Sequence, residues 1–193
     1  MKYRSILLFG APGVGKGTQG KILGGIPNYF HCACGDVFRN LRADSLLGRL
    51  FIEYSGRGQL VPDEPTIELW RNFIESSTKI GRFHPQTDTL VLDGIPRNVH
   101  QAKILRSTLK VTAVFYMHSK DENKLIARIQ RRAIKENRLD DANLRVIRDR
   151  LHVYENETRP VLDFYGRKLV HQINADQPPA SVLADILRFA VKK

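Results

Sequence analysis

The most informative stretch of this sequence lies near the N-terminus and reads Ile6-Leu7-Leu8-Phe9-Gly10-Ala11-Pro12-Gly13-Val14-Gly15-Lys16-Gly17-Thr18. Its apolar start is typical of a strand that is buried on both faces. The glycines at 13 and 15 then let the backbone turn its N–H groups inward, and a helix that begins there adds its positive dipole. A strand, then a glycine-rich turn with Lys16 at its end, then a helix is the pattern of a P-loop. A P-loop binds phosphates.

Apolar runs alternate with amphipathic segments along the rest of the chain. Strands are predicted at Ile6–Phe9, Thr89–Asp93, Val111–Met117 and Leu169–Asn174, with a fifth short strand near Phe30–Ala33. Helices are predicted at Gly15–Leu23, Asp36–Arg42, Leu46–Ser55, Glu64–Ser76, Asn98–Thr108, Asp121–Arg132, Ala142–Phe164 and Pro179–Val191. This alternation predicts an α/β fold in which helices flank a doubly wound, five-stranded parallel sheet.

Two stretches fit the alternation poorly, and we interpret both as small inserts beside a central site. Residues 35–61 are polar and helical without a strand, and residues 133–137 form a brief charged break between helices. At 193 residues the chain is of a size that folds around one core. We therefore expect a single domain over 1–193, with inserts at about 33–62 and about 133–137.

Composition and charge narrow the class of protein. The 42% hydrophobic and 26% charged residues are ordinary for a globular chain, and no apolar run approaches the roughly 20 residues needed to cross a bilayer. The first apolar run is also too short for a signal peptide, so we expect a cytoplasmic protein that does not associate with membranes. The net charge of +11 calls for a polyanionic partner.

The basic residues are spread along the chain and interrupted by acidic ones, which favours small phosphorylated ligands over nucleic acid. A basic nucleic-acid-binding P-loop protein remains an alternative. Cys32 and Cys34 are too close for an unstrained disulfide and too few for a zinc site, and the six histidines lack the spacing of metal ligands. We expect no zinc and no structural metal.

A glycine follows Lys16, and the hydroxyl is delayed to Thr18. The string Gly-Ala-Pro-Gly-Val-Gly-Lys-Gly-Thr-Gln, ending at Gln19, resembles the adenylate kinases and the pyrimidine-monophosphate kinases. The resemblance extends from Ile6 to about Pro178 and implies a P-loop kinase fold with a nucleoside-monophosphate (NMP)-binding insert and a short lid. It also implies that the phosphates of ATP bind at Gly13, Val14, Gly15, Lys16, Gly17 and Thr18.

The segment Asp93-Gly94-Ile95-Pro96-Arg97 resembles the Asp-Gly-Phe-Pro-Arg segment of adenylate kinases, with Ile95 in the aromatic place. The resemblance implies that Gly94 and Arg97 bind the acceptor nucleotide and that Asp93 organises hydrated Mg²⁺, which enters with ATP. The trailing Gln101 would read the adenine edge, since its amide offers a donor beside an acceptor. Because an amide can flip, Gln101 alone does not exclude guanine.

The segment Cys34-Gly35-Asp36-Val37-Phe38-Arg39 resembles the Thr-Gly-Asp segment of the family, whose arginine binds the acceptor phosphate. Cys34 replaces the usual threonine, and a thiol is the weaker hydrogen-bonding group. This departure and Asn98 support a CMP/UMP kinase as the alternative, whereas Gln101 opposes it. The following segment resembles the adenylate kinase version and implies that the AMP pocket is lined by Gln59, Leu60 and Val61.

Four arginines and a glutamine complete the resemblance. Arg128 and Arg132 lie four apart on one helix face, as do the arginines that bind donor phosphate and stack on adenine in the family. Arg138 and Arg150 match the cations after the lid, although Arg148 is an alternative to Arg150. Gln177 matches the turn that lies against the donor adenine through its backbone.

The expected reaction is reversible transfer of a phosphoryl group from Mg-ATP to AMP by a monomeric enzyme. The acceptor oxygen is already ionised at neutral pH, so no catalytic base is needed. The reaction instead needs neutralised phosphates, in-line alignment and exclusion of water. The cations expected to supply the charge are Lys16, Arg39, Arg97, Arg132, Arg138 and Arg150.

Overall fold

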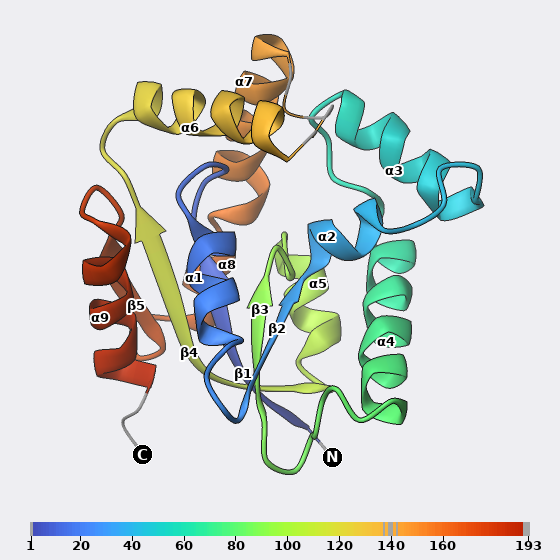
Figure 1. Ribbon diagram of the computed structural model, residues 1–193, viewed down its shortest axis with the longest axis vertical. Helices are drawn as coiled ribbons and strands as arrows, with labels where there is room; N and C mark the ends of the chain where they lie inside the picture. Colours follow the sequence, from blue (N-terminus) through green and yellow to red (C-terminus); the bar gives the residue numbers. More distant parts are fainter. Residues whose placement is uncertain (1, 137, 139–140, 142, 191–193) are drawn as a thin grey trace.

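A parallel sheet occupies the centre of the computed structural model, which describes residues 2–136, 138, 141 and 143–190 (Figure 1). Its strands are β1 (Tyr3–Phe9), β2 (Tyr29–Ala33), β3 (Thr89–Asp93), β4 (Leu109–His118) and β5 (Val170–Asn174). They lie in the order β2-β3-β1-β4-β5, and every neighbouring pair is parallel. The predicted α/β class and five-stranded parallel sheet are confirmed.

The helices are α1 (Lys16–Leu23), α2 (Cys34–Arg39), α3 (Leu46–Gly56), α4 (Asp63–Lys79), α5 (Val99–Leu105), α6 (Glu122–Lys135), α7 (Leu144–Val153), α8 (Val161–Tyr165) and α9 (Pro179–Ala190). Several begin at a polar capping side chain, as expected for helix N-termini. Ser45 accepts a hydrogen bond from the Gly48 N–H, and Asp121 accepts one from the Lys124 N–H. Within the described residues, none of these helices is both long and apolar enough to cross a membrane.

The single helix predicted over residues 142–164 is wrong. The chain instead forms α7, a π-helical turn at Tyr154–Thr158, and the short α8. Pro160 explains the interruption, because proline has no N–H to donate and its ring clashes with the carbonyl of the preceding helical turn. The predicted start at 142 and the predicted end of the last helix at 191 lie outside the described residues.

The charged break predicted at residues 133–137 is wrong at its start. Helix α6 continues to Lys135, because the sequence up to that residue consists largely of good helix formers. Residue 137 lies outside the described part of the chain. The bounds of the two inserts therefore stay predictions.

Alternation along the strands divides the apolar core between the two faces of the sheet. In β1, Leu7 and Phe9 pack against one set of helices, whereas Ile6 and Leu8 pack against the other. The first face is covered by residues of α4, α5 and α8, and the second by residues of α1, α6, α7 and α9. Such period-2 burial on both faces is what a continuous apolar strand predicts.

The carboxyl ends of three strands lie together and carry the P-loop, Cys34 and Asp93. Leu8 of β1 is in register with Asp93 of β3, which is in register with Ala33 of β2. Helices α2, α3, α6 and α7 lie beyond this end of the sheet, opposite the two chain termini (Figure 1). In open α/β sheets this edge is where ligands bind.

Phe83 joins the N-terminal strand to the core, and its removal should destabilise the whole fold. It is 1% exposed, with its ring centroid 5.5 Å from that of Tyr3 and 5.1 Å from that of Phe30. We expect Phe83→Ala to lower the free energy of unfolding by about 3–5 kcal/mol. The measurement is urea denaturation followed by the fluorescence of Trp70, the only tryptophan in the sequence. Ile80→Ala is the control, because this side chain is 67% exposed, and it should change the free energy of unfolding by less than about 0.5 kcal/mol.

Candidate functional site

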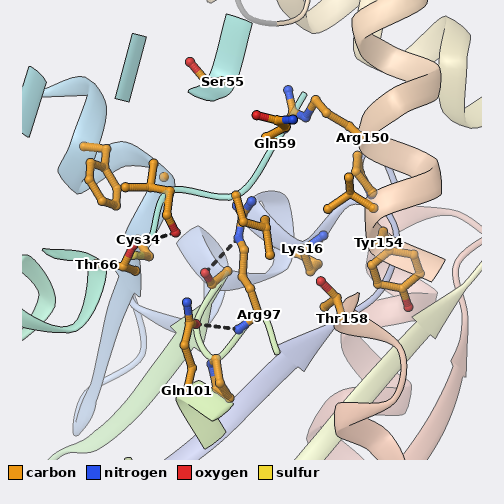
Figure 2. Close-up of a pocket in the computed structure, with 18 of the residues that line it drawn as sticks. Lys16, Cys34, Ser55, Gln59, Thr66, Arg97, Gln101, Arg150, Tyr154 and Thr158 are labelled. Carbon is orange, nitrogen blue, oxygen red and sulfur yellow. Dashed lines mark hydrogen bonds between the residues drawn. The ribbon is translucent and has the colours of Figure 1, made fainter. Parts of the chain in front are cut away.

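Two cavities open at the carboxyl ends of the strands and share a wall. The first lies between the sheet, α2, α3 and the π-helical turn, and Figure 2 shows 18 of the residues that line it. The second lies over the P-loop, beneath α6. Lys16, Gly35, Gly94 and Arg97 line both cavities, so a group bound in one would lie close to a group bound in the other.

The P-loop wraps one end of the second cavity. Gly13 and Gly15 have φ angles of +80° and +106°, which residues other than glycine rarely adopt. A Cβ atom at Gly13 would also lie 2.7 Å from the Leu125 carbonyl oxygen, so α6 packs directly on the loop. Helix α1 begins at Lys16 with Gly15 as its N-cap, and its positive end therefore faces the cavity. The predicted phosphate-binding residues that line this cavity are Gly13, Val14, Gly15, Lys16, Gly17 and Thr18.

Lys16 is held in place by the loop that precedes it. Its ammonium group donates hydrogen bonds to the Gly10 carbonyl at 2.7 Å and to the Ala11 carbonyl at 3.1 Å. The pKa of Lys16 is lowered to about 8, chiefly by burial; Asp93 opposes this shift, and the nearby arginines add to it. Keeping the buried Lys16 ammonium protonated is therefore unfavourable in free energy, and a bound phosphate would offset this by its negative charge.

A buried carboxylate holds two of the predicted cationic residues. Asp141 is 0% exposed, and its Oδ2 accepts hydrogen bonds from Arg132 Nε at 2.9 Å and Arg132 Nη2 at 2.5 Å. The other oxygen of Asp141 accepts from Arg150 Nη1. Because Arg132 extends from α6 and Arg150 from α7, Asp141 fixes both guanidinium groups relative to each other. Arg132 lines the second cavity and Arg150 the first.

A second carboxylate connects α2 with a residue that follows α6. Asp36 in α2 accepts hydrogen bonds from Arg39 at 2.7 Å and from Arg138 at 3.3 Å. Burial by itself would raise the pKa of Asp36, but the hydrogen bond and charge of Arg39 and the charge of Arg138 outweigh it, so this pKa is lowered. Arg138 also donates to Glu136 at 2.7 Å. Arg39 and Arg138 both line the second cavity.

The first cavity is mainly apolar and offers flat surfaces. Phe38 and Phe51 stack with ring centroids 5.2 Å apart and planes 13° from parallel, and both line the cavity. The predicted Gln59, Leu60 and Val61 line it as well. Cys34 is 3% exposed, and burial raises the pKa of its thiol to about 11, so the thiol stays protonated and can donate only a weak hydrogen bond. Such a cavity suits a planar ring more than a chain of phosphates.

Arg97 and Gln101 close the inner end of the first cavity. Arg97 Nε donates to the Gly94 carbonyl at 3.0 Å, which holds the guanidinium at the wall shared with the second cavity. Gln101 is 1% exposed, and its Oε1 accepts a hydrogen bond from the Arg97 N–H at 2.7 Å (Figure 2). The inner end of this cavity thus combines an amide with a guanidinium.

The outer part of the second cavity carries the other predicted donor-side residues. Arg128 is exposed and donates to the Ala175 carbonyl at 3.4 Å, and Gln177 Nε2 donates to Asp185 at 2.6 Å. Both line the cavity, as does Asp93 at the end of β3. Arg148, the alternative to Arg150, is exposed on α7 and lines neither cavity.

Several residues that shape the site were not predicted. Asp36 and Asp141 hold predicted cations, and Asp63 accepts a hydrogen bond from the Gln101 amide at 2.7 Å. Tyr154 and Thr158 of the π-helical turn line the first cavity. The two cations of α6 that line the second cavity without having been predicted are Arg131 and Lys135. One signal was present in the sequence, since Asp141 closes the segment Arg138-Leu139-Asp140-Asp141 that matches the end of the lid.

The described residues contain no group of three or more His, Cys, Asp or Glu side chains able to hold a metal ion. A hydrated Mg²⁺ carried by a polyphosphate needs less, because it keeps several waters and takes one or two protein oxygens. Asp93 and Thr18 supply such oxygens on the wall of the second cavity, and a Cβ at Gly17 would lie 3.6 Å from Asp93 Oδ2. The donor set therefore fits a magnesium ion that enters with a polyphosphate.

Comparisons with known proteins agree on one family. The family model described as "Adenylate kinase" matches residues 8–170. Curated proteins named adenylate kinase include one from Parabacteroides distasonis, 34% identical over 83% of both chains, and one from Porphyromonas gingivalis, 36% identical over 86% of this chain and 84% of its own. A third, from Cyanothece sp., is 38% identical over 94% of this chain and 92% of its own.

The lowered pKa of Lys16 makes phosphate binding depend on pH. The unliganded ammonium loses its proton as the pH rises through about 8, and the neutral amine no longer attracts phosphate. We expect the affinity for inorganic tripolyphosphate, measured by titration calorimetry, to fall above that pH by up to about tenfold per pH unit. Lys16→Met is the control, because it shares the titration of the ligand but lacks the ammonium. An equal pH dependence in both proteins would contradict the prediction.

Proposed function

The chain belongs to the adenylate kinase family and catalyses phosphoryl transfer between ATP and AMP, and on that premise we propose which of its residues bind each nucleotide and stabilise the transfer. The observation that carries the proposal is the common wall of the two cavities, formed by Lys16, Gly35, Gly94 and Arg97. A donor phosphate in the second cavity and an acceptor phosphate in the first would meet at this wall. In-line transfer requires such a meeting point.

ATP occupies the second cavity. The N–H groups of Gly13, Val14, Gly15 and Gly17 enclose its phosphates, and Lys16 contacts the phosphates that react. Thr18 adds a hydroxyl, Arg128 lies against the adenine, and the backbone at Gln177 borders the same ring. Support for this assignment comes from the position of these residues around one cavity at the N-terminus of α1.

AMP occupies the first cavity. Its base lies between the apolar walls near Cys34 and the backbone of Gln59, Leu60 and Val61, and Gln101 reads its edge. Its phosphate reaches toward the shared wall, where Gly94 and Arg97 bind it with help from Arg39. The apolar lining at one end and the guanidinium at the other support this orientation of the nucleotide.

Adenylate kinases use Mg-ATP, and Asp93 with Thr18 would hold the ion through its waters. The ion supplies positive charge next to the phosphates of ATP while they are bound. We propose that no zinc is bound, because Cys32 and Cys34 are both buried with pKa values raised by burial, which disfavours the thiolate that zinc requires.

The transfer itself needs alignment and charge rather than a base. The bond from the γ-phosphorus of ATP to its bridging oxygen breaks, and an ionised oxygen of the AMP phosphate forms the new bond to that phosphorus. Lys16 and Arg97 lie at the meeting point and stabilise the charge of the transferring group. Arg132 of α6, Arg138 after that helix and Arg150 of α7 extend toward the same region, where they also exclude water.

The excess of basic residues is explained by the phosphate groups of these two nucleotides, so we propose no nucleic-acid partner. We also propose that the protein is a monomer and that it is located in the cytoplasm, as expected for the family. The monomeric state would be supported if the purified protein has the mass of one chain in size-exclusion chromatography with light scattering.

A panel of acceptors tests the base assignment. The protein and Mg-ATP are incubated with AMP, CMP, UMP, GMP or dTMP in separate reactions, and the ADP formed is measured. We expect AMP to be the preferred acceptor, because Gln101 offers a donor beside an acceptor. A preference for CMP would contradict the assignment and would favour the pyrimidine alternative raised by Cys34.

Single substitutions at the shared wall test the proposed catalytic roles. We expect Lys16→Met and Arg97→Ala to fold normally and to lose roughly 10³-fold or more in kcat, because each removes a cation from the transferring phosphate. Circular dichroism and steady-state kinetics are the measurements. Arg148→Ala serves as the matched control at an exposed arginine off both cavities and should retain activity. Near-normal turnover in either of the first two variants would refute the assignment.

A further inference from the structure

An acidic residue outside the cavity wall fixes the direction in which the Gln101 amide points. Asp63 is the first residue of α4, and its Oδ1 accepts a hydrogen bond from Gln101 Nε2 at 2.7 Å. The Gln101 Oε1 accepts from the Arg97 N–H at 2.7 Å. A backbone N–H can only donate and an ionised carboxylate can only accept, so the two partners impose one orientation on the amide.

The neighbouring amide reinforces this arrangement. Asn98 Oδ1 accepts from the Gln101 N–H at 2.8 Å, which leaves Asn98 Nδ2 to donate to Asp63 Oδ1, also at 2.8 Å. His100 Nδ1 lies 2.8 Å from the other carboxylate oxygen. Burial alone would raise the pKa of Asp63, but hydrogen bonds from His100, Asn98 and Gln101 outweigh it, and the lowered pKa keeps the carboxylate ionised.

Turning the Gln101 amide over would create two repulsive contacts. The amide oxygen would face the Asp63 carboxylate, and the amide N–H groups would face the Arg97 N–H. Both polar atoms of Gln101 are buried, so neither could turn to water instead. An unsatisfied buried polar group of this kind is costly, and the flipped form is therefore disfavoured.

We propose that Asp63 is a positioning residue for base selection, which acts by holding the Gln101 amide in one orientation. This proposal rests on the proposed function, in which Gln101 reads the base of AMP. With the orientation fixed, the free N–H of Nε2 and the free lone pair of Oε1 point to fixed places in the first cavity. They match a base edge that offers a donor and an acceptor in one order, and they reject the edge with the reverse order.

Inosine monophosphate (IMP) is the probe that isolates this effect. It matches AMP in phosphate, ribose and ring size, but it carries a carbonyl oxygen where adenine has its amino group and an N–H where adenine has a bare ring nitrogen. Its edge is therefore the reverse of the adenine edge. Binding IMP to Gln101 requires the flipped amide that Asp63 opposes.

The measurement is kcat/KM for AMP and for IMP with saturating Mg-ATP, expressed as the ratio of the two values. We expect Asp63→Asn to lower this ratio about tenfold or more, mainly through a gain with IMP, because an amide at position 63 can donate as well as accept. Asp63→Glu keeps an acceptor-only carboxylate and should retain more of the ratio.

Glu64→Gln is the matched control, because it removes the same charge from the same turn of α4 at an exposed position. Its ratio should stay at the wild-type value. If Asp63→Asn does not fold, Asp63→Ser is measured instead, since a hydroxyl also donates and accepts. A purely structural role for Asp63 would lower kcat/KM for AMP and IMP by the same factor and leave the ratio unchanged, which would overturn the proposal.

Failure of the proposal and failure of the proposed function give different results. A wild-type protein that prefers AMP to IMP, together with an unchanged ratio in Asp63→Asn, rejects only the role of Asp63. A wild-type protein without any preference for AMP over IMP rejects the reading of the base by Gln101, and the role of Asp63 with it.

Discussion

Like charges repel, and the site of this protein gathers cations around one shared wall. Lys16 shows the consequence, since burial and three arginines lower its pKa to about 8. The arrangement is stable because carboxylates stand between the cations: Asp141 joins Arg132 to Arg150, and Asp36 joins Arg39 to Arg138. Those carboxylates also determine where the guanidinium groups point. Preorganised charge of this kind favours transfer of a charged group without rearrangement at the moment of reaction.

The fold explains why this charge collects at one place. Parallel strands bring their carboxyl ends to one edge, so that the P-loop, Cys34 and Asp93 become neighbours although they lie far apart in sequence. Helices α6 and α7 then add their arginines from above that edge. Because α6 also packs directly on Gly13, the P-loop and the arginines of α6 form one connected unit.

Much of the fold and of the site could be predicted from the sequence, and the features that were missed have a physical explanation. Apolar runs of strand length and the P-loop predicted the sheet and the phosphate site, because both signals are local. Two of the missed carboxylates have a distant partner: Arg138 lies 102 residues from Asp36, and Gln101 lies 38 residues from Asp63. No local pattern records such pairs. The break between α7 and α8 was missed although Pro160 is visible in the sequence, because the apolar period continues past it.

The central claim is that donor and acceptor nucleotides bind in adjoining cavities and that their phosphates meet at Lys16 and Arg97. Titration calorimetry with a compound in which a chain of phosphates joins two adenosines tests it most directly. The account predicts that one molecule binds per chain, that prior saturation with either ATP or AMP weakens its binding, and that Arg97→Ala weakens it too. Binding of two molecules per chain, or competition with only one of the two nucleotides, would contradict the account.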